Sequence, residues 1–210
     1  MNVDVNGSES TTTAPYGLEL SGARARLYHA AVEAFAAKGF HGTTTRDIAS
    51  RAGMSPAALY VHHRSKEEVL HLISSTGHAQ TLAIVEGAIA STDDPVAALE
   101  RLVVDFVEHH AVNHTVARVV NYELTSLSPE HLREVRSMRR SMDAQVRALV
   151  QSGVDAGAFT VGSVAMTAAA ILSLGIDVAR WFETDAGWTP RDLAEHHRAL
   201  VLRMVGVPTR

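Results

Sequence analysis

Basic side chains are concentrated in one stretch of this 210-residue chain. Between Ser21 and Lys66 there are seven Lys or Arg residues and two acidic ones, although the whole chain carries a formal net charge of −4. From Glu67 to Arg210 there are twelve Arg and eighteen acidic residues. A basic segment on an acidic body has the electrostatics needed to bind a polyanion such as nucleic acid. From charge alone, the uneven distribution could also be a chance fluctuation in composition.

Twelve histidines are the other group that could do chemistry. His110 and His114 are four residues apart, so one helical face could present two metal ligands, with His109 and Glu108 adjacent. Asn113 is a candidate helix break between them, and no third ligand follows at a fixed spacing. We therefore predict no metal site and no cofactor.

The sequence lacks the usual signatures of an enzyme. There is no cysteine, which excludes a disulfide scaffold, a thiolate metal site and a cysteine nucleophile. We find no glycine-rich phosphate loop, no nucleophile elbow and no acid–base pair at a recognisable spacing. A helical enzyme and a helical scaffold that binds no DNA remain as alternatives to the function predicted below.

Residues 43–66 predict two short helices joined by a tight turn. Ile48, Ala49 and Ala52 form an apolar face, and Gly53 supplies the flexible backbone that a helix end often needs. Ser55 is a good cap for the second helix, with Pro56 at its first position. This is a helix-turn-helix pattern, whose second helix is short enough to lie in a DNA major groove.

The rest of the chain predicts further helices and no strand, so the fold class is all-α, with about nine helices. A first helix over 21–38 precedes the helix-turn-helix, and a long one runs from Lys66 to about Ala90, with Gly77 and Gly87 as weak points. Caps, prolines and glycines divide the remainder into helices at about 95–111, 113–126, 129–156, 161–184 and 190–205.

These elements predict three regions. Residues 1–20 are polar and are expected to be disordered, with an arm that touches DNA near Arg24 and Arg26 as the alternative. Residues 21–66 are expected to form a three-helix DNA-binding domain, and 67–210 a larger helical domain for ligand binding and dimerisation. No run of eighteen apolar residues and no secretory signal is present, so we expect no membrane span and a cytoplasmic location.

Over residues 24–72 the chain resembles the TetR family of bacterial transcriptional repressors. The resemblance is carried by Phe35-Ala36-Ala37-Lys38-Gly39-Phe40, Thr43-Thr44-Thr45-Arg46-Asp47-Ile48-Ala49, Ala52-Gly53-Met54-Ser55 and Leu59-Tyr60-Val61-His62-His63-Arg64-Ser65-Lys66-Glu67. These motifs are specific in order and spacing. The family usually has an aromatic residue, most often Phe, where this chain has His63.

The resemblance implies a set of DNA contacts. Thr44, Thr45 and Arg46 match positions that hold phosphates, as does Lys66 at the start of the next helix. Ser55, Pro56, Ala57 and Tyr60 match the exposed face of the recognition helix, and Tyr60 and His62 match contacts to the backbone or to base edges. Packing of Tyr60 against the first helix and simple exposure of His62 are the alternatives.

The resemblance also implies a small-molecule cavity among the central helices, whose occupancy lowers the affinity for DNA. The predicted lining is apolar with a few polar groups: Phe106, Arg118, Val119, Tyr122, Met138, Met142, Leu172 and Ile176. A plain helical core explains the same apolar residues.

Asn121-Tyr122-Glu123-Leu124 and Arg180-Trp181-Phe182 are similar to regulators of fatty-acid and steroid catabolism, which implies a small hydrophobic effector with an acyl-CoA as one candidate. Arg136, Arg139 and Arg140 then either bind its phosphates or form a solvated face. The family dimerises through its last two helices, so the predicted partners are a second copy of the chain and a palindromic double-stranded DNA operator. Effector binding is expected to tilt the helix that starts at Lys66.

Overall fold

The computed structural model describes residues 12–14, 18–20, 22–185 and 187–208. Within them the predicted all-α fold is confirmed, with nine α-helices: α1 (Gly22–Gly42), α2 (Thr45–Arg51), α3 (Pro56–His62), α4 (Lys66–Ala90), α5 (Pro95–Val112), α6 (His114–Tyr122), α7 (Pro129–Asp155), α8 (Val164–Trp181) and α9 (Pro190–Met204). A 3₁₀ turn, Leu124–Ser126, follows α6 where the sequence predicts a longer helix.

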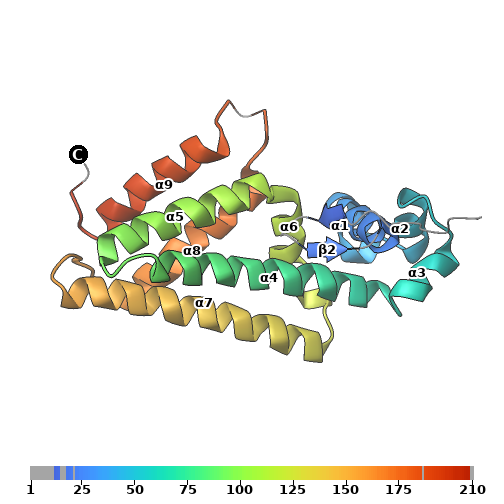
Figure 1. The fold of residues 1–210 in the computed structure, drawn as a ribbon, viewed down its shortest axis with the longest axis horizontal. Helices are drawn as coiled ribbons and strands as arrows, with labels where there is room; N and C mark the ends of the chain where they lie inside the picture. The colour runs from blue at the N-terminus through green and yellow to red at the C-terminus, as the bar shows by residue number, and fades with distance from the viewer. Residues whose placement is uncertain (1–11, 15–17, 21, 186, 209–210) are drawn as a thin grey trace, which may run out of the picture.

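The molecule is elongated, with α1 to α3 gathered at one end (Figure 1). We call these three helices the head, and α5, α7, α8 and α9 the body. Helix α4 leaves the head and runs alongside α7 into the body, while α6 lies between the head and the body (Figure 1). The long helix α4 is therefore a continuous connection between the two ends.

The N-terminal segment departs from the prediction of disorder. Thr12–Ala14 (β1) pairs antiparallel with Leu18–Leu20 (β2), with Thr12 opposite Leu20. Three residues per strand are too few for sequence alternation to be visible, and burial of Leu20 in the core of the head fixes the pair in place. The other residues of the predicted tail lie outside the described residues.

Side-chain caps set most of the helix starts. Ser55, Ser65, Ser128 and Ser163 each accept a hydrogen bond from a backbone N–H in the first turn of the following helix. Thr44 and Thr189 do so within reciprocal capping boxes, and Asp94 caps α5. Because these residues satisfy otherwise unpaired N–H groups, the starts predicted for α2 to α5, α7 and α9 agree closely with the structure.

Two apolar cores stabilise the molecule. The core of the body joins α5, α7, α8 and α9 with Val85 and Ala88 near the end of α4. The core of the head extends past residue 66, because Val69, Leu70 and Ile73 of α4 belong to it together with Val116 and Val119 of α6. Helices α4 and α6, which extend to the body, therefore each contribute one face to the core of the head.

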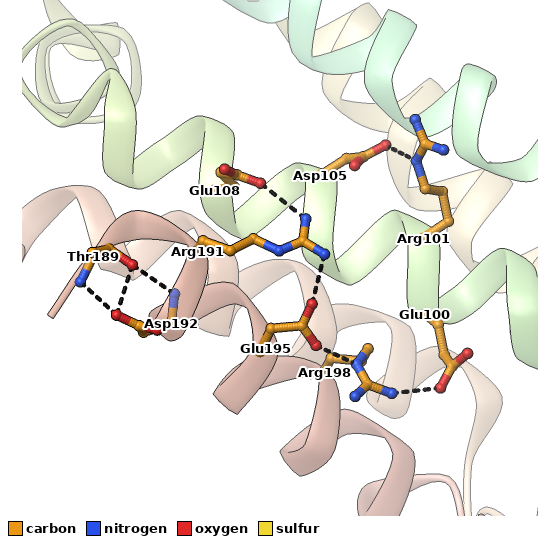
Figure 2. A network of polar contacts seen from close by, with 9 residues as sticks. All are labelled: Glu100, Arg101, Asp105, Glu108, Thr189, Arg191, Asp192, Glu195 and Arg198. Atoms are coloured by element: carbon orange, nitrogen blue, oxygen red, sulfur yellow. Dashed lines mark hydrogen bonds and ion pairs between the residues drawn. The ribbon is translucent and has the colours of Figure 1, made fainter.

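A network of charged residues covers the exposed side of the α5–α9 contact (Figure 2). Arg191 bridges Glu108 at 3.3 Å and Glu195 at 2.6 Å, and Arg198 bridges Glu100 at 2.7 Å and Glu195 at 2.8 Å. A single exposed ion pair contributes little to stability, whereas a network in which one residue pairs with two others favours one arrangement of the helices. The network fixes how α9 lies on α5.

Helix α8 is long and apolar enough to cross a membrane by length and composition, and it is the one such helix in the described part of the chain. Core helices of soluble proteins meet the same criterion. Here α8 packs on α5 and α7, with Ala168, Ile171 and Val178 buried.

Candidate nucleic-acid interface and ligand cavity

The turn between α2 and α3 is built as the sequence predicts. Gly53 has a φ of 67°, in the left-handed region that glycine tolerates, and the Met54 N–H donates to the Ala49 carbonyl at 2.8 Å. The Ser55 hydroxyl accepts from the Ala58 N–H at 3.3 Å. Leu59 is fully buried. One side of α3 is thereby held against the head, and the opposite side is presented to solvent.

The exposed face of α3 contains most of the residues predicted for it. Ser55, Pro56 and Ala57 are exposed, and Tyr60 keeps 55% of its surface accessible. His62 is half-buried. Val61, which is not among the predicted contacts, is 79% exposed. A valine in a short apolar helix suggests core packing, and only its spacing of four residues from Ala57 indicates that it shares the exposed face.

The start of α2 lies next to α3. The Thr45 Oγ1 is 3.4 Å from the Tyr60 Oη, so the two hydroxyls share one surface, and Arg46 beside them is exposed. The Thr44 hydroxyl accepts from the Asp47 N–H and donates to the Asp47 carboxylate at 2.8 Å. The Thr44 N–H also donates to this carboxylate and, with the hydroxyl, lowers the pKa of Asp47. Thr44 therefore fixes the start of α2.

Lys66, predicted to hold a phosphate, is hydrogen-bonded to the head. Its Nζ donates to the backbone carbonyls of Phe40 and Thr43, each at 2.6 Å, and lies 4.0 Å from the centre of the Phe40 ring. Desolvation lowers the pKa of this ammonium. The Phe40 carbonyl also accepts from the Thr43 N–H at 3.2 Å, so Lys66 adds a second hydrogen bond at the end of α1 and one to the residue that follows it. Its geometry makes it a link between α1 and α4, and the predicted phosphate contact stays a prediction.

His63 occupies the interior position where the resemblance leads one to expect an aromatic residue. It is buried, and its N–H donates to the Leu59 carbonyl at 2.9 Å at the end of α3. Burial lowers its pKa, and the positive charge of Arg24 lowers it further. A neutral imidazole therefore fills the space behind the recognition helix.

A cavity of about 460 Å³ lies among α4, α5, α6, α7 and α8. Four predicted residues line it, namely Phe106, Met142, Leu172 and Ile176. Tyr122 lines an adjoining groove of about 530 Å³ that shares Arg139, Ser173 and Ile176 with the cavity. The Tyr122 hydroxyl donates to Asp177 at 3.4 Å. Five of the eight predicted ligand residues are thus brought together.

The other three predicted ligand residues are not part of either space. Val119 is buried in the core of the head, and Met138 packs against that core. Arg118 lines neither space, and its Nε is buried without a hydrogen-bond partner. For Arg118 and Val119 the prediction named the wrong face of α6, because Ala117, Val120 and Asn121 are the α6 residues that line the cavity. Residues 116 and 119 point to the head instead.

Sequence analysis largely missed the polar part of the cavity. His78, Thr81, His110 and Asn121 line it, beside Arg136, Arg139 and Arg140, which were named above as possible phosphate contacts. Burial lowers the pKa of His78 and of His110 to about 4, so both are neutral at pH 7. His110, considered above as a metal ligand, instead hydrogen-bonds through Nδ1 to the Phe106 carbonyl at 2.8 Å. No group of three His, Asp or Glu side chains suited to a metal occurs in the ranges that the structure describes.

Comparison with known families decides the classification. Residues 27–73 match the family described as bacterial regulatory proteins, tetR family, and residues 92–205, more than half of the chain, match the tetracyclin repressor-like C-terminal domain. The chain belongs to the TetR family. As a TetR-family member it is a helix-turn-helix transcriptional regulator.

Individual relatives agree with this classification. A tetR-family regulatory protein from Rhodococcus RHA1 is 42% identical, with a TM-score of 0.84 over 90% of this chain and all of the other. The HTH-type transcriptional repressor KstR2 of Rhodococcus jostii is 27% identical over 90% of this chain and 93% of its own. AibR, solved with isovaleryl coenzyme A and operator DNA, has a TM-score of 0.79 over 90% of this chain and all of its own, but at 18% identity it shows a shared fold alone.

Proposed function

We propose that this TetR-family regulator is a repressor that binds a palindromic DNA operator as a homodimer and is released by a small hydrophobic effector in the cytoplasm. The observation that carries the proposal is the continuity of α4. This helix starts beside the recognition helix, with Lys66 tied to the end of α1, and further along it lines the cavity with His78 and Thr81.

The DNA-binding part of the proposal rests on the shared surface of α2 and α3. Tyr60, Val61 and Ala57 are exposed on α3, and Thr45 and Arg46 lie at the start of α2 beside them. Hydroxyls and arginine suit phosphate contacts, and small or apolar side chains suit contact with thymine methyl groups. Lys66 uses two of its three N–H groups on the Phe40 and Thr43 carbonyls, and the third remains for the predicted phosphate contact.

An unpartnered apolar surface supports dimerisation through α8 and α9. Met166, Leu174 and Trp181 of α8, Met204 of α9 and Trp188 between the two helices are all exposed. Large apolar side chains gathered on adjacent elements are typical of protein–protein interfaces. Two recognition helices must reach successive major grooves about 34–36 Å apart, so a two-fold dimer matches a palindromic operator.

Helices α4 and α6 provide a route from the cavity to the head. On α6, Val116 and Val119 pack in the core of the head, while Ala117 and Asn121 line the cavity. Val120 does both and touches α4 at Gly77, where there is no room for a β-carbon. A ligand that displaces α6 would therefore tilt α4 and change the spacing of the recognition helices. Coupling of about 1–3 kcal/mol, typical of allosteric systems, suffices for release.

The effector part of the proposal rests on the lining of the cavity. Apolar side chains predominate, and a volume of about 460 Å³ suits a small organic molecule. Acyl-CoA esters are candidates, because AibR, which shares this fold, was solved with one together with its operator.

Selection of DNA by the purified protein from a library of random duplexes tests the proposal and identifies the operator in one experiment. The selection should yield an enriched palindrome whose half-sites are centred about 10 base pairs apart, or a multiple of one helical turn. A parallel selection with Tyr60→Ala as the bait should lose the enrichment. Enrichment of no motif by the wild-type dimer would contradict the proposal.

A further inference from the structure

Arg139 lies where the cavity and the adjoining groove meet, since it lines both. Its Nη1 donates to the Oδ1 of Asn121 at 3.1 Å and to the Nε2 of His78 at 3.3 Å. Both acceptors are neutral. Within the described part of the chain no ion pair involves Arg139, nor Arg136 or Arg140, the other arginines of the cavity. Two carboxylates line the same spaces, but Asp143 pairs with Arg147 and Asp177 pairs with Arg180. The three cations therefore have no carboxylate bound to any of them.

The histidines beside Arg139 have fixed tautomers. The Nδ1 of His78 lies 2.8 Å from the Ser74 carbonyl oxygen, and the Nδ1 of His110 lies 2.8 Å from that of Phe106. A carbonyl only accepts, so each Nδ1 carries the proton and each Nε2 in the neutral ring is an acceptor. The pair therefore supplies hydrogen-bond acceptors near Arg139 but no negative charge.

The guanidinium of Arg139 is left with an unused pair of donors. Both hydrogen bonds of Arg139 are made by Nη1, and Nε and Nη2 have no hydrogen-bond partner among the described residues. The N–H groups of Nε and Nη2 point in the same direction, which matches the two oxygens of a carboxylate or a phosphate. A half-buried cation without a counter-ion is costly, and its pKa is lowered by desolvation.

Apolar side chains complete the same space. Phe106 and Leu172 line the cavity, and Ile176 lines both the cavity and the groove. Building on the proposed function, we infer that the effector is an amphipathic anion, with a carboxylate or phosphate bound by the Nε and Nη2 of Arg139 and an apolar chain against Phe106 and Leu172. The assignment makes Arg139 the anchor of the ligand.

Matched charged and neutral probes test this inference by calorimetry on the intact dimer. Octanoate is compared with methyl octanoate, which lacks the carboxylate charge, and octanoyl-CoA with octanoyl-pantetheine, which lacks the phosphates of the nucleotide. We expect at least one anion to bind about 10-fold or more tightly than its neutral counterpart. The pair that shows the difference identifies the source of the anionic group.

Substitution of Arg139 assigns the effect to this residue. Arg139→Met should lower the affinity for that anion about 10-fold or more and change the affinity for the neutral probe by less than about 3-fold. Arg139→Lys, which keeps the charge but loses the parallel donors, should fall between the two. Arg133→Met, at an exposed arginine of the same helix, should bind like the wild type.

Three results would overturn the inference: equal binding of charged and neutral probes by the wild type, unchanged binding of the anion by folded Arg139→Met, or binding of none of the four probes at millimolar concentration. If Arg139→Met does not fold, comparison of the charged and neutral probes on the wild type and on Arg139→Lys still tests whether Arg139 binds the anion. Operator binding is measured on the same preparations. Its persistence alongside a negative result would leave the regulator standing and remove only the anionic effector.

Discussion

Tyr60 is the largest exposed side chain of the recognition helix, and its hydroxyl lies beside that of Thr45. The pair could be anticipated only in part. Sequence motifs indicate that both residues belong to the DNA-binding surface, but fifteen residues separate them and nothing in their spacing shows that the hydroxyls meet. The contact follows from how Gly53 turns α3 across α2.

Replacing Tyr60 with alanine should weaken operator binding about 10-fold or more, because an aromatic ring and its hydroxyl are lost from the centre of the surface. Stability should change little, since the side chain is 55% exposed. Fluorescence anisotropy at fixed salt measures the first effect, and urea unfolding the second. Val112→Ala, at an exposed apolar residue of α5, is the matched control and should leave DNA affinity unchanged. Equal loss in both variants would contradict the assignment.

The buried histidines of the cavity make stability depend on pH. Burial lowers the pKa of His78 and His110 to about 4, whereas an unfolded histidine titrates near 6.5. The unfolded chain therefore binds more protons between pH 6.5 and 4, so the stabilisation is complete above pH 6.5 and is lost as the pH falls toward 4. At pH 5 the loss is about 2 kcal/mol per histidine.

Urea unfolding at pH 7.5 and pH 5.0 measures this loss. The free energy of unfolding should fall between the two values, and His110→Gln, which cannot titrate, should show a smaller fall. A free energy that does not change with pH would show that these imidazoles remain accessible to protons in the folded protein.

At the scale of the elements, most helix starts could be predicted, whereas the faces of α6 could not. Ser55, Ser65 and Thr189 cap their helices where local sequence places them, because a cap depends on neighbours within one turn. The α6 residues Val119 and Asn121 show the limit. Both lie in a short helix between the head and the body. Only the three-dimensional arrangement decides which face of α6 contacts the head and which face lines the cavity.

Helix α4 offers a matched pair of glycines. A β-carbon at Gly77 would lie 2.6 Å from the Val120 Cγ2, and Val120 is buried and rotates little because it is β-branched. Gly77→Ala should therefore lower the free energy of unfolding by about 1–3 kcal/mol. At Gly87 nothing lies within 4 Å, so Gly87→Ala should raise it by about 0.5–1 kcal/mol, the usual gain in a helix.

Chemical unfolding of the two variants beside the wild type tests this pair. The two substitutions are expected to change the free energy of unfolding in opposite directions. Stabilisation by both substitutions would show that α6 does not press on α4 at Gly77, and that the proposed route from the cavity to the head is absent.

At the scale of the whole molecule, exposed apolar residues predict a dimer through α8 and α9. Trp181→Glu places a charge on that surface and should shift the protein toward monomer, because a buried charge without a partner is costly. Sedimentation velocity measures the oligomeric state. Operator affinity should fall in parallel, since one head alone loses the effective concentration of the second. Val112→Glu, on an exposed apolar residue outside α8 and α9, should remain dimeric.

The fold and its DNA-binding end could be predicted because the signals are local: caps, a turn glycine and a dense motif. The polar cavity could not, because His78, His110 and Arg139 come from three helices and no local spacing shows that they meet. Lys66 shows the same limit, since its acceptors at Phe40 and Thr43 lie more than twenty residues earlier.

The most direct test of operator recognition is an anisotropy titration of palindromic DNA from upstream of the gene itself, with a scrambled duplex of equal length beside it. We predict saturation at two protomers per palindrome, weaker binding to the scrambled duplex, and an affinity that falls steeply as salt is raised, because phosphate contacts release counterions. Equal and weak binding of both duplexes at low salt by the folded protein would contradict the assignment of this protein as an operator-binding regulator.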